Sequence, residues 1–136
     1  MKLYVHSTED IMCMARVGWV LPHETNGIEI YIHTNDGGNV PHFHVRKYGK
    51  HNKFEWEVCV AFQDAKYFKH GKYKDEFPNT KIAKDLDKTL RMVDPDSRHG
   101  STYWEIAIEE WNRNNSDRKI PLDLVQPDYR HINGTM

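Results

Sequence analysis

The feature that most constrains the fold is a pair of alternating runs on either side of a turn. The first run is Ile28–His33, the second covers residues 40–46, and the segment between them contains two glycines next to Asn35 and Asp36. This pattern is typical of a β-hairpin. Because side chains alternate across a strand, the isoleucines of the first run share one face, and Phe43 and Val45 form the apolar face of the second. If the two apolar faces coincide, the opposite face is polar and carries these side chains: Glu29, Tyr31, His33, His42, His44 and Arg46.

Further strands are expected on both sides of this hairpin. Residues 16–21 look extended and end at a proline, whereas residues 1–14 fit either a strand or a turn. Residues 54–62 alternate between large apolar and smaller or charged side chains, which predicts a clear strand. A short strand over residues 65–68 would follow it.

Two helices are predicted in the second half of the chain. Apolar residues at helical spacing mark residues 80–93 and residues 103–113, and Thr102 and Glu105 have the spacing of a capping box. We therefore expect an α+β fold, in which the two C-terminal helices pack on one face of an antiparallel sheet of four to five strands. Since the helices would use the apolar face, the histidine-rich face would remain open to solvent or to a partner.

Composition points to one soluble domain with a tail. The chain has 136 residues, of which 38% are hydrophobic and 12% aromatic, enough for a single core. Its mean hydropathy is -0.81, and no apolar run approaches the roughly 20 residues of a membrane helix. No signal-peptide pattern opens the chain, so we expect a cytoplasmic protein without a membrane partner. Residues 1–114 would form the domain, and the polar residues 115–136 a tail whose apolar segment, 120–125, either adds an edge strand or embraces a partner.

The cysteines carry little functional signal on their own. Cys13 and Cys59 do not form a CxxC pair, and two reduced thiols are expected in a cytoplasmic protein. Cys59 lies within a strand that looks buried, which favours an inert thiol over a nucleophile.

Charge is unevenly distributed along the chain. Residues 46–74 carry 8 Lys or Arg against 3 Asp or Glu, and aromatic residues are interleaved with these cations. Cations contact phosphates and aromatic rings stack on bases, so this stretch predicts a nucleic-acid surface. The alternative is an ordinary solvated face, and the modest excess of charge favours it. The candidate nucleic-acid-binding residues are Lys47, Lys50, Lys53, Lys66, Tyr67, Lys69, Lys72 and Lys74.

The sequence Pro-His-Phe-His-Val at residues 41–45, following an Ile-Tyr-Ile strand, resembles a family of small bacterial proteins known as "domain of unknown function 4160". The resemblance runs in order over residues 14–114, and its one specific part is the His-Phe-His-Val block. The family has no established activity. Its members look like components of mobile or toxin–antitoxin-type gene pairs, which implies a role with nucleic acid or with a partner protein.

Three functions fit the polar face. The first is a ribonuclease in which His42 and His44, about 7 Å apart along a strand, act as base and acid. Arg46 would neutralise charge on the phosphate, and Tyr31 would orient the substrate. The 2′-hydroxyl of RNA would make a metal unnecessary.

The second is a metal site. His33, His42 and His44, with Glu29 or Asp36 as a further ligand, offer nitrogen and oxygen donors suited to zinc or another divalent transition metal. This site requires the two strands to pair in the correct register.

The third is a binding module without catalysis. We expect a nucleic-acid-interacting protein of toxin–antitoxin or mobile-element type, with histidine-dependent or metal-dependent ribonuclease activity as one outcome. The alternative is an inhibitor or regulator, antitoxin-like or directed against phage defence, that binds a nucleic-acid-handling protein.

Overall fold

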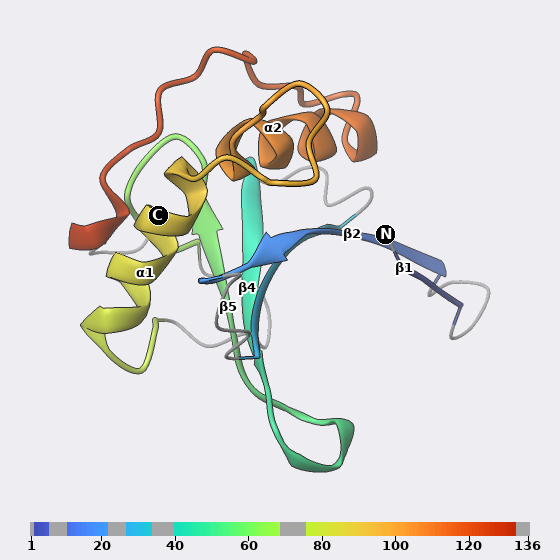
Figure 1. The fold of residues 1–136 in the computed structure, drawn as a ribbon. Coiled ribbons are helices and arrows are strands. Elements are labelled where there is room, and N and C mark those ends of the chain that lie inside the picture. The colour runs from blue at the N-terminus through green and yellow to red at the C-terminus, as the bar shows by residue number, and fades with distance from the viewer. Residues whose placement is uncertain (1, 6–10, 22–26, 34–39, 69–75, 133–136) are drawn as a thin grey trace.

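A five-stranded antiparallel sheet and two helices make up the fold, as the computed structural model shows (Figure 1), and this confirms the predicted α+β class. The structure describes residues 2–5, 11–21, 27–33, 40–68 and 76–132. Each strand pairs with the next along the chain, in the order β1-β2-β3-β4-β5. The strands are β1 (Lys2–Val5), β2 (Ile11–Trp19), β3 (Ile28–His33), β4 (His42–Tyr48) and β5 (Phe54–Ala61), and the helices are α1 (Thr80–Arg91) and α2 (Tyr103–Asn114).

The central hairpin has the register that the alternation predicts. Tyr31 pairs with His44, and Glu29 pairs with Arg46, so the polar residues of β3 and β4 share one face of the sheet. On the other face Ile30 pairs with Val45, and both residues are fully buried. The two apolar faces therefore coincide.

The helices cover this apolar face. Leu86 and Leu90 of α1 and Ile108 of α2 are fully buried and join the isoleucines and valines of the sheet in one core. In Figure 1, α2 lies above the upper end of β4 and α1 lies beside β5, while the β4–β5 hairpin extends away from both helices. At Gly18 of β2, a Cβ atom would lie 2.7 Å from the ring of Tyr103, so only glycine admits this close approach of α2.

The largest differences between the predicted and observed elements are the following. β2 begins at Ile11, within the stretch that fitted either a strand or a turn, and not at residue 16. Residues 65–68 do not form a strand, although Tyr67 makes an isolated bridge to Val60. α1 ends at Arg91, because the N–H of Met92 turns back to the carbonyl of Thr89.

The segment after α2 packs on its own domain. Ile120 and Tyr129 are buried members of the core, and the indole N–H groups of Trp104 and Trp111 donate to backbone carbonyls of this segment. It ends in a short 3-10 turn, η2 (Tyr129–His131), against α1. Within the described part of this segment, up to residue 132, there is no edge strand, so of the two alternatives for residues 120–125 the edge strand is wrong. Among the described residues, no helix combines the length and apolar character needed to cross a membrane.

Candidate metal centre

The polar face of the hairpin is buried, so the prediction that it lies open is wrong. His42 and His44 are both 0% exposed. The ring of His42 packs against Phe68, which follows β5, and against Trp111 of α2, at centroid distances of 4.7 and 5.6 Å. Sheet alternation predicts which face a side chain lies on, but not what the rest of the chain folds over that face.

This burial bears on the predicted ribonuclease. The rings of His42 and His44 lie 5.0 Å apart, with no exposed surface on either residue. A phosphodiester has no access between them in this conformation. Tyr31, the residue predicted to orient the substrate, is only 1% exposed and donates its hydroxyl to the carboxylate of Glu57.

Two β5 side chains converge on His44. In the β4–β5 ladder His44 pairs directly with Cys59, and the thiol sulfur lies 3.4 Å from Nδ1 of His44. Glu57, two residues earlier on the same face of β5, places a carboxylate oxygen 3.3 Å from the same nitrogen. Nδ1 of His44, which contacts both the thiol and the carboxylate, is therefore at the centre of this cluster.

His42 is held in one tautomer by the backbone. Its Nδ1 lies 2.7 Å from the carbonyl oxygen of Val40. Because a carbonyl oxygen only accepts hydrogen bonds, Nδ1 carries the proton and the basic lone pair is on Nε2. A hydrogen bond from one ring nitrogen to a backbone carbonyl is the usual way in which proteins orient a metal-ligating histidine.

The potential ligands form two groups that share His44. His42, His44 and Cys59 are all buried and offer ligand atoms within 4.8 Å of one another, so they could hold a metal ion. His33, His44 and Glu57 form a second, partly exposed group by the same measure. The ring of His33 stacks on that of His44 at 4.3 Å. The predicted triad of His33, His42 and His44 is thus divided between two ligand groups, each completed by a residue of β5.

Glu57 is held in its charged form. Burial alone would raise its pKa, but hydrogen bonds with His44 and Tyr31, together with the nearby charge of Arg46, outweigh burial and lower the pKa below its ordinary value. A carboxylate that stays ionised stabilises positive charge at the position of His44, whether that charge is a proton or a metal ion.

Arg46 and Glu29 belong to a separate, structural ion cluster. Glu29 is 1% exposed and accepts hydrogen bonds from Arg16, Arg46 and the hydroxyl of Tyr48. The guanidinium of Arg46 lies 4.1 Å from the ring centroids of both Tyr31 and Phe54. Arg46 is therefore not placed to contact a substrate phosphate, and Glu29 is not among the ligand groups. Asp36, the other predicted carboxylate ligand, lies outside the described residues.

The basic stretch does not form one surface among the described residues. Lys47, Lys50 and Lys53 lie at the end of the hairpin where β5 begins, whereas Lys66 lies beside Ala61, at the other end of β5. Tyr67 is buried, and its hydroxyl accepts a hydrogen bond from the N–H of Phe77, so its ring is not available for stacking on a base. Three further candidates, Lys69, Lys72 and Lys74, lie outside the described residues.

Sequence reasoning missed the two β5 members of the cluster. Glu57 and Cys59 alternate with the large apolar residues of β5, and this alternation already placed them on the polar face. What the sequence did not contain was the β4–β5 register that sets Cys59 opposite His44.

Comparisons with protein-family models, curated proteins and solved structures gave no match for this chain. The resemblance to the "domain of unknown function 4160" family therefore stays a prediction.

Proposed function

We propose that this protein binds a divalent transition metal ion, zinc in the first instance, through His42, His44 and Cys59. The observation that carries the proposal is that two imidazoles and one thiol, all buried, bring their ligand atoms within 4.8 Å of one another. Nitrogen and sulfur donors together are the combination that zinc prefers.

The spacing of the donors supports this proposal. Zinc–nitrogen and zinc–sulfur bonds of about 2.0 and 2.3 Å at a tetrahedral angle give a nitrogen–sulfur separation of about 3.5 Å. The thiol sulfur of Cys59 lies 3.4 Å from Nδ1 of His44. The tautomer of His42, fixed by the carbonyl of Val40, leaves Nε2 as the basic atom that a metal requires.

The burial of the ligands favours a structural role for the ion. Catalytic zinc sites keep a coordination position open to substrate, whereas structural sites are closed. His42 and His44 are 0% exposed and Cys59 is 1% exposed. An ion bound there would join β4 to β5, and its binding free energy would add to the stability of the sheet.

The proposal is tested by loading the purified protein with Co²⁺ after treatment with a chelator. We expect one bound ion per chain and an absorption band from thiolate-to-cobalt charge transfer. Cys59→Ser should remove that band, and His44→Ala should abolish stoichiometric binding. Zn²⁺ at about 100 times its dissociation constant should stabilise the wild-type fold by about 2.7 kcal/mol.

The matched control is His99→Ala, which removes an exposed histidine and should leave metal binding unchanged. Stoichiometric Co²⁺ binding without a thiolate band would assign the ion to His33, His44 and Glu57 instead. Absence of bound metal, together with an unchanged unfolding temperature on adding Zn²⁺, would overturn the proposal.

A further inference from the structure

The outer end of the β4–β5 hairpin is a compact, exposed turn, here called the hairpin tip and defined as residues 47–54. The turn is closed by hydrogen bonds from the N–H of Gly49 to the carbonyl of Lys53 and from the N–H of Lys53 to the carbonyl of Lys50. Lys50, His51 and Lys53 are exposed. In Figure 1 the tip extends from the sheet on the side away from α1 and α2.

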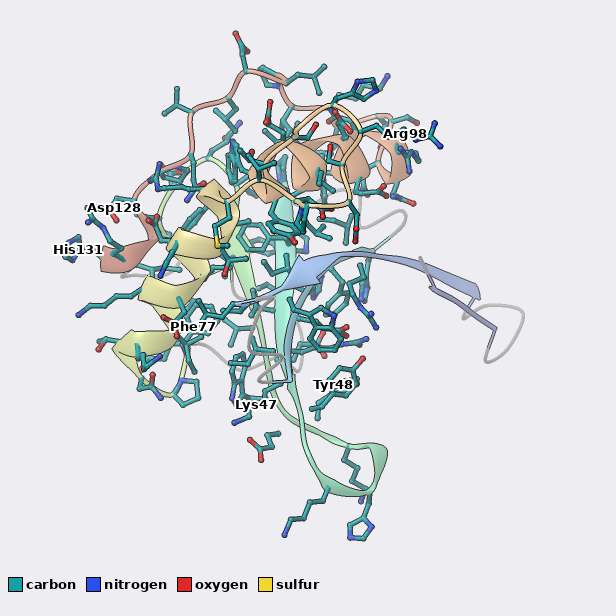
Figure 2. All side chains as sticks on the ribbon, viewed as in Figure 1. Lys47, Tyr48, Phe77, Arg98, Asp128 and His131 are labelled. Carbon is teal, nitrogen blue, oxygen red and sulfur yellow. The ribbon has the colours of Figure 1, made fainter. Side chains whose placement is uncertain are left out.

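The tip is positively charged and its charge is largely uncompensated. Its sequence contains three lysines and no Asp or Glu. Within the described part of the chain, Lys50 and Lys53 form no ion pair with a carboxylate. Lys47 lies 3.7 Å from Glu55, and because the two side chains are 38% and 54% exposed, this contact neutralises little of the charge. Figure 2 shows Lys47 and Tyr48 where the tip begins, well apart from Asp128 and His131.

An aromatic ring lies beside these cations. Phe54 is 40% exposed, and among the described residues it is the only aromatic in the set of exposed large hydrophobic side chains. Arg46 stacks on this ring at 4.1 Å and Tyr48 packs near it at 5.0 Å, so the ring is held in place although part of it faces solvent. A partly exposed aromatic ring that adjoins a lysine-rich turn is an arrangement on which a nucleic-acid base can stack while its phosphates meet the charges.

We propose that the hairpin tip binds nucleic acid, with Lys47, Lys50 and Lys53 against the phosphates and Phe54 against a base. A two-stranded ribbon is also narrow enough to enter the major groove of duplex DNA. The contact is electrostatic in origin and independent of sequence, so a dissociation constant of about 10 to 100 µM at physiological salt is expected.

This surface is separate from the metal centre. The two sites share no residue, because the ligands are His42, His44 and Cys59, whereas the tip begins at Lys47, about 10 Å from His44 along β4. Nucleic-acid binding therefore does not depend on the ion, and loss of one property leaves the other measurable.

The test is the fluorescence anisotropy of labelled single-stranded RNA, single-stranded DNA and duplex DNA with the full chain at low and moderate salt. Lys50→Glu with Lys53→Glu should weaken binding at least tenfold. The matched control is Lys84→Glu with Lys88→Glu, which reverses the same charge at two exposed positions of α1 and should change affinity by less than twofold.

Two further measurements identify the contact. With about three neutralised phosphates, the logarithm of the binding constant should fall with that of the salt concentration with a slope of about −2 for single strands. Phe54→Ala should weaken binding of single strands more than binding of duplex DNA. Thermal unfolding of each variant verifies that the fold is intact.

The proposal is overturned if no oligonucleotide binds at low salt, or if the α1 control weakens binding as much as the tip variant. It also fails if poly-glutamate binds as tightly as the oligonucleotides, because an acidic protein surface would then be the better partner. If only one form of nucleic acid binds, and the tip variant loses that binding, the proposal is supported and that form is identified as the ligand.

Discussion

At the scale of single residues, His44 is the centre of one of the buried polar clusters of the molecule. Nδ1 of this histidine lies 3.4 Å from the sulfur of Cys59 and 3.3 Å from the carboxylate of Glu57. The ring of His33 stacks on it from β3. Buried polar groups are costly unless they are paired, so the cluster is maintained by its internal contacts and, as proposed above, by a metal ion.

Glu57 gives a pH prediction at this scale. Its pKa is lower in the folded protein than in the unfolded chain, so the ionised carboxylate stabilises the fold above the unfolded-state pKa. This contribution is lost as the pH falls through the lower folded-state value. In urea unfolding of the metal-free protein, Glu57→Gln should lower the free energy of unfolding at pH 7 and flatten its decline below pH 4.5.

The control for this experiment is Glu109→Gln, at an exposed position of α2, which should follow the wild-type curve. A Glu57→Gln variant with the wild-type acid dependence would show that its hydrogen bonds with Tyr31 and His44 contribute no net stability.

At the scale of elements, local sequence signals set the ends of the helices. The side chain of Thr102 accepts a hydrogen bond from the N–H of Glu105, and the carboxylate of Glu105 accepts one from the N–H of Thr102. This reciprocal capping box fixes the start of α2. Asn79 caps α1 by accepting from the N–H of Ile82.

Thr102→Ala should therefore destabilise the protein by about 1 kcal/mol, because the N–H of Glu105 in the first turn loses its acceptor. Equilibrium urea unfolding measures the change. Thr80→Ala, at the exposed first position of α1, is the comparison and should stay within about 0.5 kcal/mol of wild type. Equal stability of both variants would mean that tertiary packing alone positions α2.

The elements also show how far sequence reasoning reached. Alternation and helical spacing predicted the hairpin, β5 and both helices. Each of these elements buries one face, and the apolar residues of that face recur at the strand or helix period in the local sequence. The same alternation placed the six polar side chains of β3 and β4 on one face. Alternation did not predict that this face is buried, because Phe68 and Trp111, which pack against His42, come from other parts of the chain. It also failed for the full ligand set, because the pairing of His44 with Cys59 depends on the β4–β5 register.

At the scale of the whole molecule, the segment after α2 completes the core. Tyr129 is fully buried, packs edge-on against Phe43 at 5.8 Å, and donates its hydroxyl to the carbonyl of Ala61 at 2.6 Å. Burial raises the pKa of Tyr129 well above its ordinary value, so the hydroxyl stays protonated as a donor. Asp87 of α1 accepts hydrogen bonds from Gln126 and from the N–H of Tyr129, which fastens the segment to the helix.

Tyr129→Ala should then lower the free energy of unfolding by about 3 to 5 kcal/mol, the range for removing a buried aromatic side chain. That is a large share of the stability of an ordinary domain. Leu122→Ala removes an apolar side chain of the same segment that is 65% exposed, and should change stability by no more than about 0.5 kcal/mol. Chemical denaturation of the two variants side by side measures the difference, and a small effect of Tyr129→Ala would mean that the segment is dispensable for folding.

The position of Tyr129 in the chain determines when, during synthesis, the core can be completed. Each strand of the sheet pairs with its predecessor in the chain, so pairing can proceed while the polypeptide is still being synthesised. The core, however, lacks a ring between Phe43 and Trp104 until Tyr129 has left the ribosome. A nascent chain that has not yet reached Tyr129 exposes part of its apolar core, and exposed apolar surface is what chaperones bind. The sheet is thus assembled early, but the core is completed only by a residue that follows both helices in the chain.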